Sequence, residues 1–331
     1  MPVLEVGGTH VTAALVDLSG GRTVGEVVRR PLPAQGTAEE ILDGIAATAA
    51  RIDAPAGAAW GVAVPGPFDY ASGIALFEDV GKFDALYGVD VRAELSRRMR
   101  PVPGALRFLN DADAFGIGEC VVGAAAGHER AVCITLGSGV GSAFLDRGEP
   151  VNDGPLVPPD GSAHLLSYDG RPLEETVSRR AIRAAYAGAV PADQGLVGDV
   201  PDVPGVPDAS GVPGVPGVPD VHAIAELARG GDRDARAALE HAFRALGVAL
   251  APWLARFGAT ALVVGGSMAA SWDLIEGPLR SGAGTGAGAG RAVRLRFRAA
   301  ERAHDAPLLG AAAWAARPQS AAVAGHGPHV G

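Results

Sequence analysis

Short apolar runs separated by glycine-containing turns fill the first third of the chain, and amphipathic stretches come between and after them. The runs predict β-strands, and stretches whose apolar residues recur every three or four positions predict helices. Strands are expected over residues 3–6, 11–16, 22–30, 60–64 and 106–109, and helices over residues 37–51, 91–99 and from 112 onward. Hairpins followed by alternating helices and strands are typical of an α/β protein with a mixed sheet.

The second half of the chain repeats this scheme. It opens with a strand, a glycine turn and a second strand over residues 131–136, 137–141 and 142–145. Later helices are expected over residues 173–189, 221–229, 232–257 and from 269, and later strands over 261–264 and 292–297. We therefore expect two domains, residues 1–111 with a closing helix at 304–316, and the larger residues 112–303.

Two low-complexity segments interrupt the second half. Residues 190–220 repeat Val-Pro-Gly and Val-Pro-Asp units, in which proline removes hydrogen-bond donors and glycine adds backbone entropy. We expect this segment to be a solvent-exposed, flexible insertion. A second loop is expected over residues 281–290 and a disordered tail over residues 317–331.

Asn110 and Asp111 fall where a buried strand is expected to stop and a helix to start. In open α/β sheets, ligands bind at this carboxyl edge of the strands. The nearby helix N-terminus favours the ionised form of Asp111, and an ionised carboxylate there can take a proton from a substrate hydroxyl. The plainer interpretation is that Asn110 simply caps the helix.

Two glycine turns each join a pair of strands. Gly7-Gly8-Thr9 closes the first hairpin, and Gly137-Ser138-Gly139 closes the corresponding hairpin of the second half. Successive backbone N–H groups in such turns can hold a phosphate, although a glycine hairpin is often no more than a hairpin. The Gly137 turn lacks the following helix that a dinucleotide-binding motif requires.

Composition narrows the class of protein. The chain has 331 residues, of which 48% are hydrophobic, and a net charge of −9. The acidic balance argues against nucleic-acid binding, and charge, glycine or proline interrupts every run that could cross a bilayer. Two cysteines cannot build a Cys-rich zinc site, and the N-terminus shows no signal peptide, so a reduced cytoplasmic location is expected.

The order of these motifs resembles the ROK family of sugar kinases, within the actin-like ATPase group. The first phosphate loop is matched by residues 4–9, the catalytic element by 110–113, the second phosphate loop by 136–141 and the adenosine loop by 264–267. Leu173-Glu174, with Ser178 after it, resembles the end of the sugar-binding signature. The resemblance implies a two-domain, ribonuclease H-like α/β fold with central mixed sheets and a cleft between the domains.

The resemblance also implies a role for each matching residue. Asp111 would be the general base in transferring phosphate from ATP, with Mg²⁺, to the 6-hydroxyl of a hexose. The implied ligands are Asn110, His164, Glu174, Asp79 and Gly66 for the sugar, and Gly7, Gly8, Thr9, Gly137, Ser138, Gly139, Gly265, Gly266 and Ser267 for ATP. A homodimer is implied by the family alone. Read without the family, His164 is an exposed loop histidine and Glu174 an acid at a helix start.

Three positions depart from the family pattern. Glu5 stands where the first loop usually begins with aspartate, and its longer arm should still reach a magnesium-bound water. The family's cysteine module is missing, so no structural zinc is expected. Gly161, with Asp160 beside it, replaces a glutamate that would accept a sugar hydroxyl, which favours a non-standard hexose.

Among family members without the cysteines, polyphosphate glucokinases and kinases of amino-hexoses such as kanosamine, in antibiotic biosynthesis, look similar. Relatives often carry an amide at the position of Asp79, and an acid there would suit a substrate amine. An ordinary ATP or polyphosphate glucokinase is the alternative. A sugar-sensing repressor would need a helix-turn-helix before residue 5, and a non-catalytic sugar binder would not need Asp111.

Overall fold

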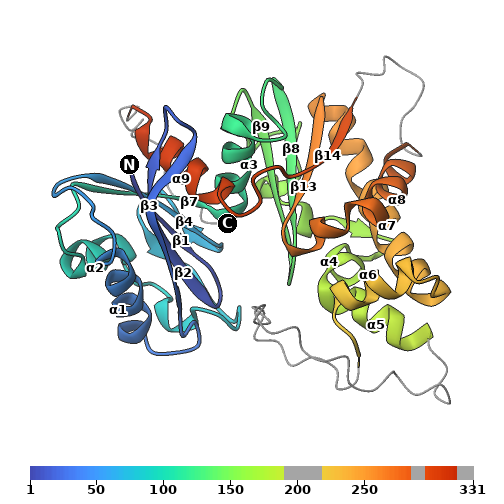
Figure 1. Cartoon of the computed structure of the whole chain (residues 1–331), viewed down its shortest axis with the longest axis horizontal. Coiled ribbons are helices and arrows are strands. Elements are labelled where there is room, and N and C mark those ends of the chain that lie inside the picture. Colours follow the sequence, from blue (N-terminus) through green and yellow to red (C-terminus); the bar gives the residue numbers. More distant parts are fainter. Residues whose placement is uncertain (190–217, 285–294, 319–331) are drawn as a thin grey trace, which may run out of the picture.

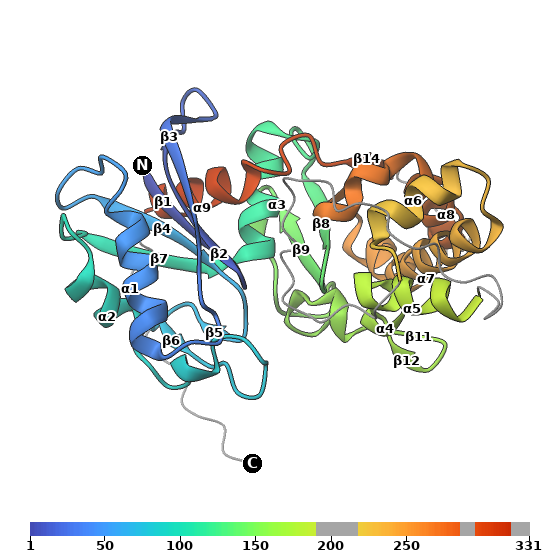
Figure 2. The ribbon, with the colours of Figure 1, turned by 60° about the horizontal axis from the view of Figure 1, so that its bottom comes forward.

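The computed structural model describes residues 1–189, 218–284 and 295–318, and it contains two separate five-stranded mixed sheets (Figure 1). The first sheet has the order β3-β2-β1-β4-β7 and the second the order β10-β9-β8-β13-β14. Figure 2 shows α3 and α9 between them. The predicted α/β class with two central mixed sheets is therefore confirmed.

In both sheets an antiparallel hairpin is extended by parallel strands. The bounds in the first sheet are Pro2–Val6 (β1), His10–Asp17 (β2), Arg22–Pro31 (β3), Ala59–Val64 (β4) and Ala105–Asn110 (β7). In the second they are Arg130–Leu136 (β8), Val140–Asp146 (β9), Glu149–Pro150 (β10), Ala261–Gly265 (β13) and Arg296–Ala299 (β14). Strands β1, β4 and β7 are parallel, as are β8, β13 and β14, so their carboxyl ends share one edge of each sheet.

Helices and small hairpins cover the outer faces. The first sheet is covered by α1 (Ala38–Ala49) and α2 (Val91–Arg98). The second half contains α4 (Glu174–Val177), α5 (Arg179–Ala189), α6 (Val221–Arg229), α7 (Arg233–Phe257) and α8 (Trp272–Gly284). The hairpins are β5–β6 (Phe68–Asp69, Ile74–Ala75) and β11–β12 (Ser167–Tyr168, Arg171–Pro172). Apolar stripes account for this placement, since Ile41, Leu42 and Ile45 of α1 are buried against the first sheet.

Helices α3 (Asp111–Val122) and α9 (Ala306–Ala316) share one buried core with the inner faces of both sheets. Their backbones meet through glycines. A Cβ on Gly118 would overlap the carbonyl of Ala306, and one on Gly310 would overlap the carbonyl of Ala114. This approach, closer than side chains allow, locks together the two helices that connect the sheets.

Buried Glu119 ties the end of α3 to the segment that leads into α9. Its carboxylate accepts hydrogen bonds from the backbone N–H groups of Ala124 at 2.7 Å, Arg302 at 2.9 Å and Glu301 at 3.3 Å. These bonds satisfy an acid that is fully removed from solvent.

Several elements differ from their predicted form. The helix expected over residues 173–189 is broken at Ser178, whose extended backbone (φ −67°, ψ 158°) separates α4 from α5 and whose Oγ accepts a bond from Ala181 N–H. Ser281–Gly284 continue α8, so the predicted loop at residues 281–290 is wrong for those four residues. In the predicted insertion, Val218 is buried and its carbonyl accepts a hydrogen bond from Arg183.

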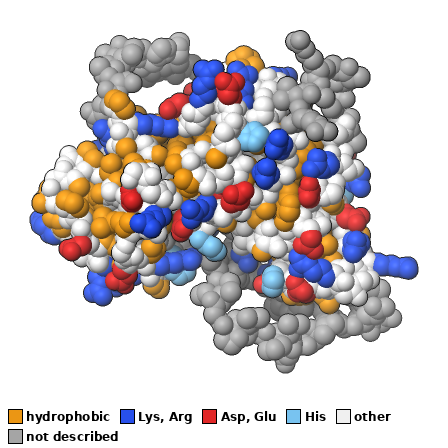
Figure 3. Space-filling view, turned by 45° about the horizontal axis from the view of Figure 1, so that its top comes forward, with side chains coloured by type: hydrophobic (Ala, Val, Ile, Leu, Met, Phe, Trp, Pro, Cys, Tyr) orange, Lys and Arg blue, Asp and Glu red, His pale blue; other side chains and the backbone are white. Residues whose placement is uncertain are grey.

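The remaining low-complexity predictions concern residues 190–217, 285–294 and 319–331, which lie outside the described part of the chain. The strand expected at 292–297 begins at Arg296 among the residues that are described. No helix in the described ranges is both long and apolar enough to cross a membrane. Figure 3 shows acidic and basic side chains lying close to one another on one face.

Candidate active site

The predicted catalytic pair lies at the junction between β7 and α3. Asn110 has an extended backbone and caps α3, because its Oδ1 accepts hydrogen bonds from the N–H groups of Ala112 (2.9 Å) and Asp113 (3.3 Å). Its Nδ2 donates to the hydroxyl of Tyr70 at 3.0 Å. The capping interpretation thus describes Asn110 as it stands, and its role in holding a sugar stays a prediction.

Asp111 opens the helix, and its Oδ1 accepts a hydrogen bond from Ala112 N–H at 2.8 Å. Burial raises the pKa of the Asp111 carboxyl, and backbone hydrogen bonds and the charge of Lys82 oppose this rise. The expectation that the helix N-terminus favours the ionised form of Asp111 is therefore wrong for this structure, because burial outweighs it. Once ionised, a carboxylate with a raised pKa is a stronger proton acceptor, which is what a general base requires.

Glu5, on β1, lies close enough to Asp111 for their charges to interact. Burial, followed by the charge of Asp111, raises the pKa of Glu5 to about 7, and Arg29 on β3 opposes the shift. Glu5 pairs in register with Thr12 of β2 and Ala63 of β4, which places its side chain on the same face as Thr12. The two carboxyls therefore form an electrostatically coupled pair at the inner side of the first sheet.

Glu5 also lines a cavity of about 340 Å³. Its walls come from β1–β3, the first glycine turn and the segment that enters α9: Glu5, Gly7, Thr9, His10, Thr12, Val27, Arg29, Ala303, His304, Asp305 and Leu308. Three predicted residues, Glu5, Gly7 and Thr9, line it. Arg29 and the hydroxyl groups of Thr9 and Thr12 offer hydrogen-bond donors to a phosphate chain, and the carboxyl groups of Glu5 and Asp305 line the same cavity.

The first glycine turn is held tightly. Gly7 N–H donates to the His10 carbonyl at 2.8 Å, and Thr9 Oγ1 lies 2.8 Å from His10 Nδ1. The side chain of Lys82 lies over Gly8, and a Cβ on Gly8 would come within 2.8 Å of its Cδ atom, so Lys82 would have to move to make room for one. The turn therefore brings the predicted phosphate loop next to a cation.

The second glycine turn is supported by Glu174. Its Oε1 accepts a hydrogen bond from Val140 N–H at 3.0 Å and crowds the position of a side chain on Gly139. Arg179 N–H donates to the Gly137 carbonyl at 3.1 Å, while Ser138 is exposed. Glu174 thus positions the turn, and its predicted contact with a sugar stays untested.

The third predicted loop packs against the second. Gly266, with φ +81°, would place a Cβ inside the backbone of Leu136, and a Cβ on Gly265 would strike the ring of Phe115. Ser267 is exposed at the start of a short 3-10 helix. The β13 loop and the β8–β9 turn consequently lie side by side, as two loops that contact one nucleotide would have to.

The predicted sugar residues are not all brought together. Gly66 adjoins Asn110 and Tyr70, since a Cβ there would lie 3.4 Å from the Tyr70 hydroxyl. Asp79 is exposed at φ +55° in the β6–α2 connection. His164 is exposed in a 3-10 turn of the second half, and that turn is fixed by a 2.7 Å hydrogen bond from Ala163 N–H to Ser142 Oγ.

Sequence reasoning missed Tyr70 and Lys82 as members of this site. Lys82 belongs to the polar loop 78–83. The composition of this loop predicts that it is exposed, but it does not predict which way the Lys82 side chain points. Tyr70 follows the turn at Gly66, and only its hydrogen bond to Asn110 identifies it.

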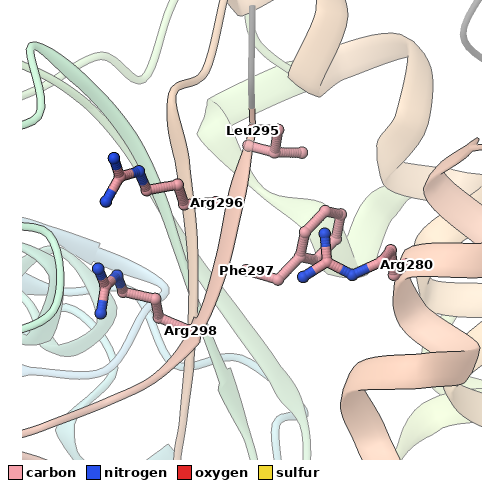
Figure 4. Close-up of a pocket in the computed structure, with 5 residues that line it drawn as sticks. All are labelled: Arg280, Leu295, Arg296, Phe297 and Arg298. Atoms are coloured by element: carbon pink, nitrogen blue, oxygen red, sulfur yellow. The ribbon is translucent and has the colours of Figure 1, made fainter.

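A second cavity, of about 440 Å³, contains none of the predicted residues. Phe297 of β14 and Leu295, just before that strand, point to one side, and Arg296 and Arg298 point to the other (Figure 4). The Arg280 guanidinium lies 4.6 Å from the centroid of the Phe297 ring. Arg280 also donates to Glu276 at 2.6 Å, so its charge is already neutralised. This cavity lies away from the Asp111 junction, toward the amino ends of the parallel strands.

Residues 2–154 and 169–318 together match the ROK family. The chain belongs to the ROK family. The family resemblance that the five motifs indicate is therefore confirmed, with the actin-like fold that it implies.

Individual ROK relatives span most of the chain. Glucokinase of Thermotoga maritima is 28% identical over 283 residues, which are 84% of either chain. Polyphosphate glucokinase of Mycobacterium leprae is 27% identical over 176 residues, covering 52% of this chain and 49% of the relative. A ROK glucokinase of Streptomyces griseus, solved with glucose and AMPPNP, has a TM-score of 0.70 at 26% identity and covers 94% of this chain and 97% of its own.

The residues of this ROK protein suit a magnesium ion bound mainly through phosphate. Mg²⁺ commonly takes one or two carboxylates, waters and substrate phosphates, and Glu5 in the wall of the 340 Å³ cavity is the carboxyl that would contact such an ion through water. Within the described residues, no three His, Cys, Asp or Glu side chains converge as a metal-binding group. Cys120 and Cys133 are free thiols in α3 and β8.

Gly161, where the ROK pattern has glutamate, is set by local packing. It is buried with φ +62°, and a Cβ would lie 2.8 Å from Asn152 Oδ1. Asn152 in turn donates to Asp113 at 3.1 Å. A larger residue at 161 would disturb this contact with α3, while neighbouring Asp160 is exposed.

Proposed function

We propose that this ROK protein is a sugar kinase that transfers the terminal phosphoryl group of ATP to the 6-hydroxyl of a glucose-type hexose. The observation that carries the proposal is the Asp111 carboxyl at the start of α3, electrostatically coupled to Glu5 and Lys82 beside the first glycine turn. The glucokinase names of its relatives support the same substrate class.

In the proposed reaction the protein positions the two substrates and neutralises the charge of the phosphates. Asp111 takes the proton of the sugar hydroxyl, the sugar oxygen forms a bond to the terminal phosphorus, and ADP leaves with the electrons of the broken P–O bond. The glycine turns supply backbone donors to the phosphates. Glu5 would hold Mg²⁺ through water, and the ion would supply charge neutralisation on the phosphate oxygens.

We further propose that the sugar is an amino-hexose such as kanosamine. An exposed carboxylate at Asp79 offers an ammonium-bearing sugar a charge-assisted hydrogen bond that an amide does not. Gly161 leaves a sugar hydroxyl without the glutamate acceptor of the family pattern, which supports an altered hexose. Glucose itself, with ATP or polyphosphate as donor, is the second candidate, and the polyphosphate glucokinase relative favours testing both donors.

The decisive experiment is a donor and acceptor screen. Purified protein with ATP or polyphosphate should phosphorylate at least one of glucose, mannose, glucosamine, N-acetylated hexosamines and kanosamine. Asp111→Asn should lower kcat by about 10²- to 10⁴-fold while sugar affinity stays within a few-fold, because general-base catalysis contributes that much. Asp43→Asn, a change on the exposed face of α1, is the matched control. Near-full turnover by Asp111→Asn would show that another group takes the proton.

A further inference from the structure

Lys82 is the single lysine in the chain; the other 27 of its 28 basic Lys and Arg side chains are arginines. The two residues differ chemically, because the lysine ammonium is a compact charge with three rotatable donors, whereas arginine presents a planar fork. A chain that uses arginine at every other cationic position therefore has its one ammonium-bearing side chain at the candidate active site.

Hydrogen bonds and a buried neighbour hold the backbone around Lys82 in place. Phe83 is buried at 1% exposure, and its N–H donates to the Ala34 carbonyl at 2.6 Å. On the other side, Asp84 accepts hydrogen bonds from the N–H groups of Val80 at 3.1 Å and Gly81 at 3.0 Å. These contacts fix the direction in which Lys82 leaves the loop.

The side chain of Lys82 reaches the first glycine turn. Its Cδ, Nζ and Cε atoms lie 2.8, 3.0 and 3.1 Å from the place that a Cβ on Gly8 would occupy. The Lys82 charge also acts on the Asp111 carboxyl. Among the described residues, no carboxylate lies within ion-pair distance of Lys82, so its ammonium is available to a ligand.

We propose that the Lys82 ammonium binds the transferred phosphoryl group itself, donating to its oxygens on the donor and through the transition state. The inference rests on the proposed kinase function. As the sugar oxygen bonds to phosphorus and the bond to ADP breaks, negative charge spreads over the phosphoryl oxygens, and the hydroxyl proton passes to Asp111. A fixed cation beside Gly8 stabilises that charge without itself gaining or losing a proton.

Two substitutions test the catalytic role. Lys82→Met keeps the length but removes the charge, and we expect kcat to fall by about 10²- to 10³-fold with the sugar KM changed only a few-fold. Lys82→Arg should recover part of the loss because it restores a cation. Arg51→Met, at an exposed position just after α1, serves as the control, and equal thermal midpoints exclude unfolding.

Because the chain has a single lysine, chemical modification can test whether the donor covers Lys82, with no variant and no catalytic assay. Acetylation by sulfo-NHS acetate, followed by mass spectrometry, has only Lys82 and the amino terminus as amine targets. We expect MgATP or polyphosphate to slow acetylation of Lys82 at least tenfold, glucose alone to leave it unchanged, and the Met1 amine to react at a constant rate as the internal reference.

The outcomes separate this inference from the function on which it rests. If the protein phosphorylates a sugar but Lys82→Met keeps kcat within threefold, or neither donor protects Lys82, the Lys82 proposal is wrong and the function stands. Protection by glucose alone would also overturn it, because Lys82 would then face the sugar. If no sugar is phosphorylated although a donor protects Lys82, the phosphate contact stands and the proposed acceptor falls.

Discussion

Asp79 is the residue on which the proposed amino-hexose preference depends. It lies in the left-handed backbone region, three residues before Lys82, and its carboxylate is exposed. One short loop therefore carries both an exposed anion and the single lysine of the chain. Under the proposed function, this loop would both select the sugar and stabilise the phosphoryl group.

Replacing Asp79 by asparagine tests the amino-hexose preference. The ratio of kcat/KM for glucosamine or kanosamine to that for glucose should fall by about tenfold, because a charge-assisted hydrogen bond to the amine is lost while the shape is kept. Asp169→Asn is the control, since Asp169 is also exposed at positive φ (51°) but lies in the β11–β12 turn. An unchanged ratio would remove Asp79 from sugar selection.

At the scale of elements, the contact between α3 and α9 determines how the two sheets are joined. Gly118 and Gly310 let the helix backbones touch. Gly61 of β4 similarly lets the Ala311 carbonyl of α9 pack against the strand, because a Cβ there would overlap that carbonyl. Helix α3, which begins at Asp111, is thereby held against α9. Small residues here are a packing requirement and not a sign of flexibility.

Gly310→Ala should destabilise the protein by about 1–3 kcal/mol, because the added methyl group overlaps the Ala114 carbonyl. Gly277→Ala, in α8, meets nothing within 4 Å and should change the stability by less than about 1 kcal/mol, because the gain in helix propensity is offset by the clash of the new Cβ with Pro278. Urea unfolding of both variants measures the contrast. Equal midpoints for the two would contradict this account of the α3–α9 contact.

At the scale of the whole molecule, acidic groups with raised pKa values gather between the two halves. Burial raises the pKa of Asp113 to about 6, with Asp111 adding to the shift and Asn152 opposing it. Glu5 has a pKa of about 7 for similar reasons. Since each folded pKa exceeds its unfolded value, the stability from these groups is present at low pH and is lost as pH rises through about 6 to 7.

Asp113→Asn should therefore flatten the dependence of stability on pH. Between pH 4 and pH 7.5 the unfolding free energy of the variant, relative to the wild type, should rise by about 2 kcal/mol, because each unit of pKa shift is worth about 1.4 kcal/mol and part of the effect is already present at pH 4. Urea denaturation at both pH values measures it. A relative change that is zero or negative would mean that Asp113 ionises in the folded protein as easily as in the unfolded chain.

The amino-acid sequence by itself determined the order of the elements, the glycine turns and the position of Asp111, because these depend on local periodicity and on residues that start and end helices. It left out the break at Ser178, the crossing of Lys82 over Gly8 and the hydrogen bond between Tyr70 and Asn110. Those features join residues far apart in the chain, or override local helix propensity through packing. Only the tertiary structure decided them, because side-chain direction across a loop depends on what the rest of the fold leaves open.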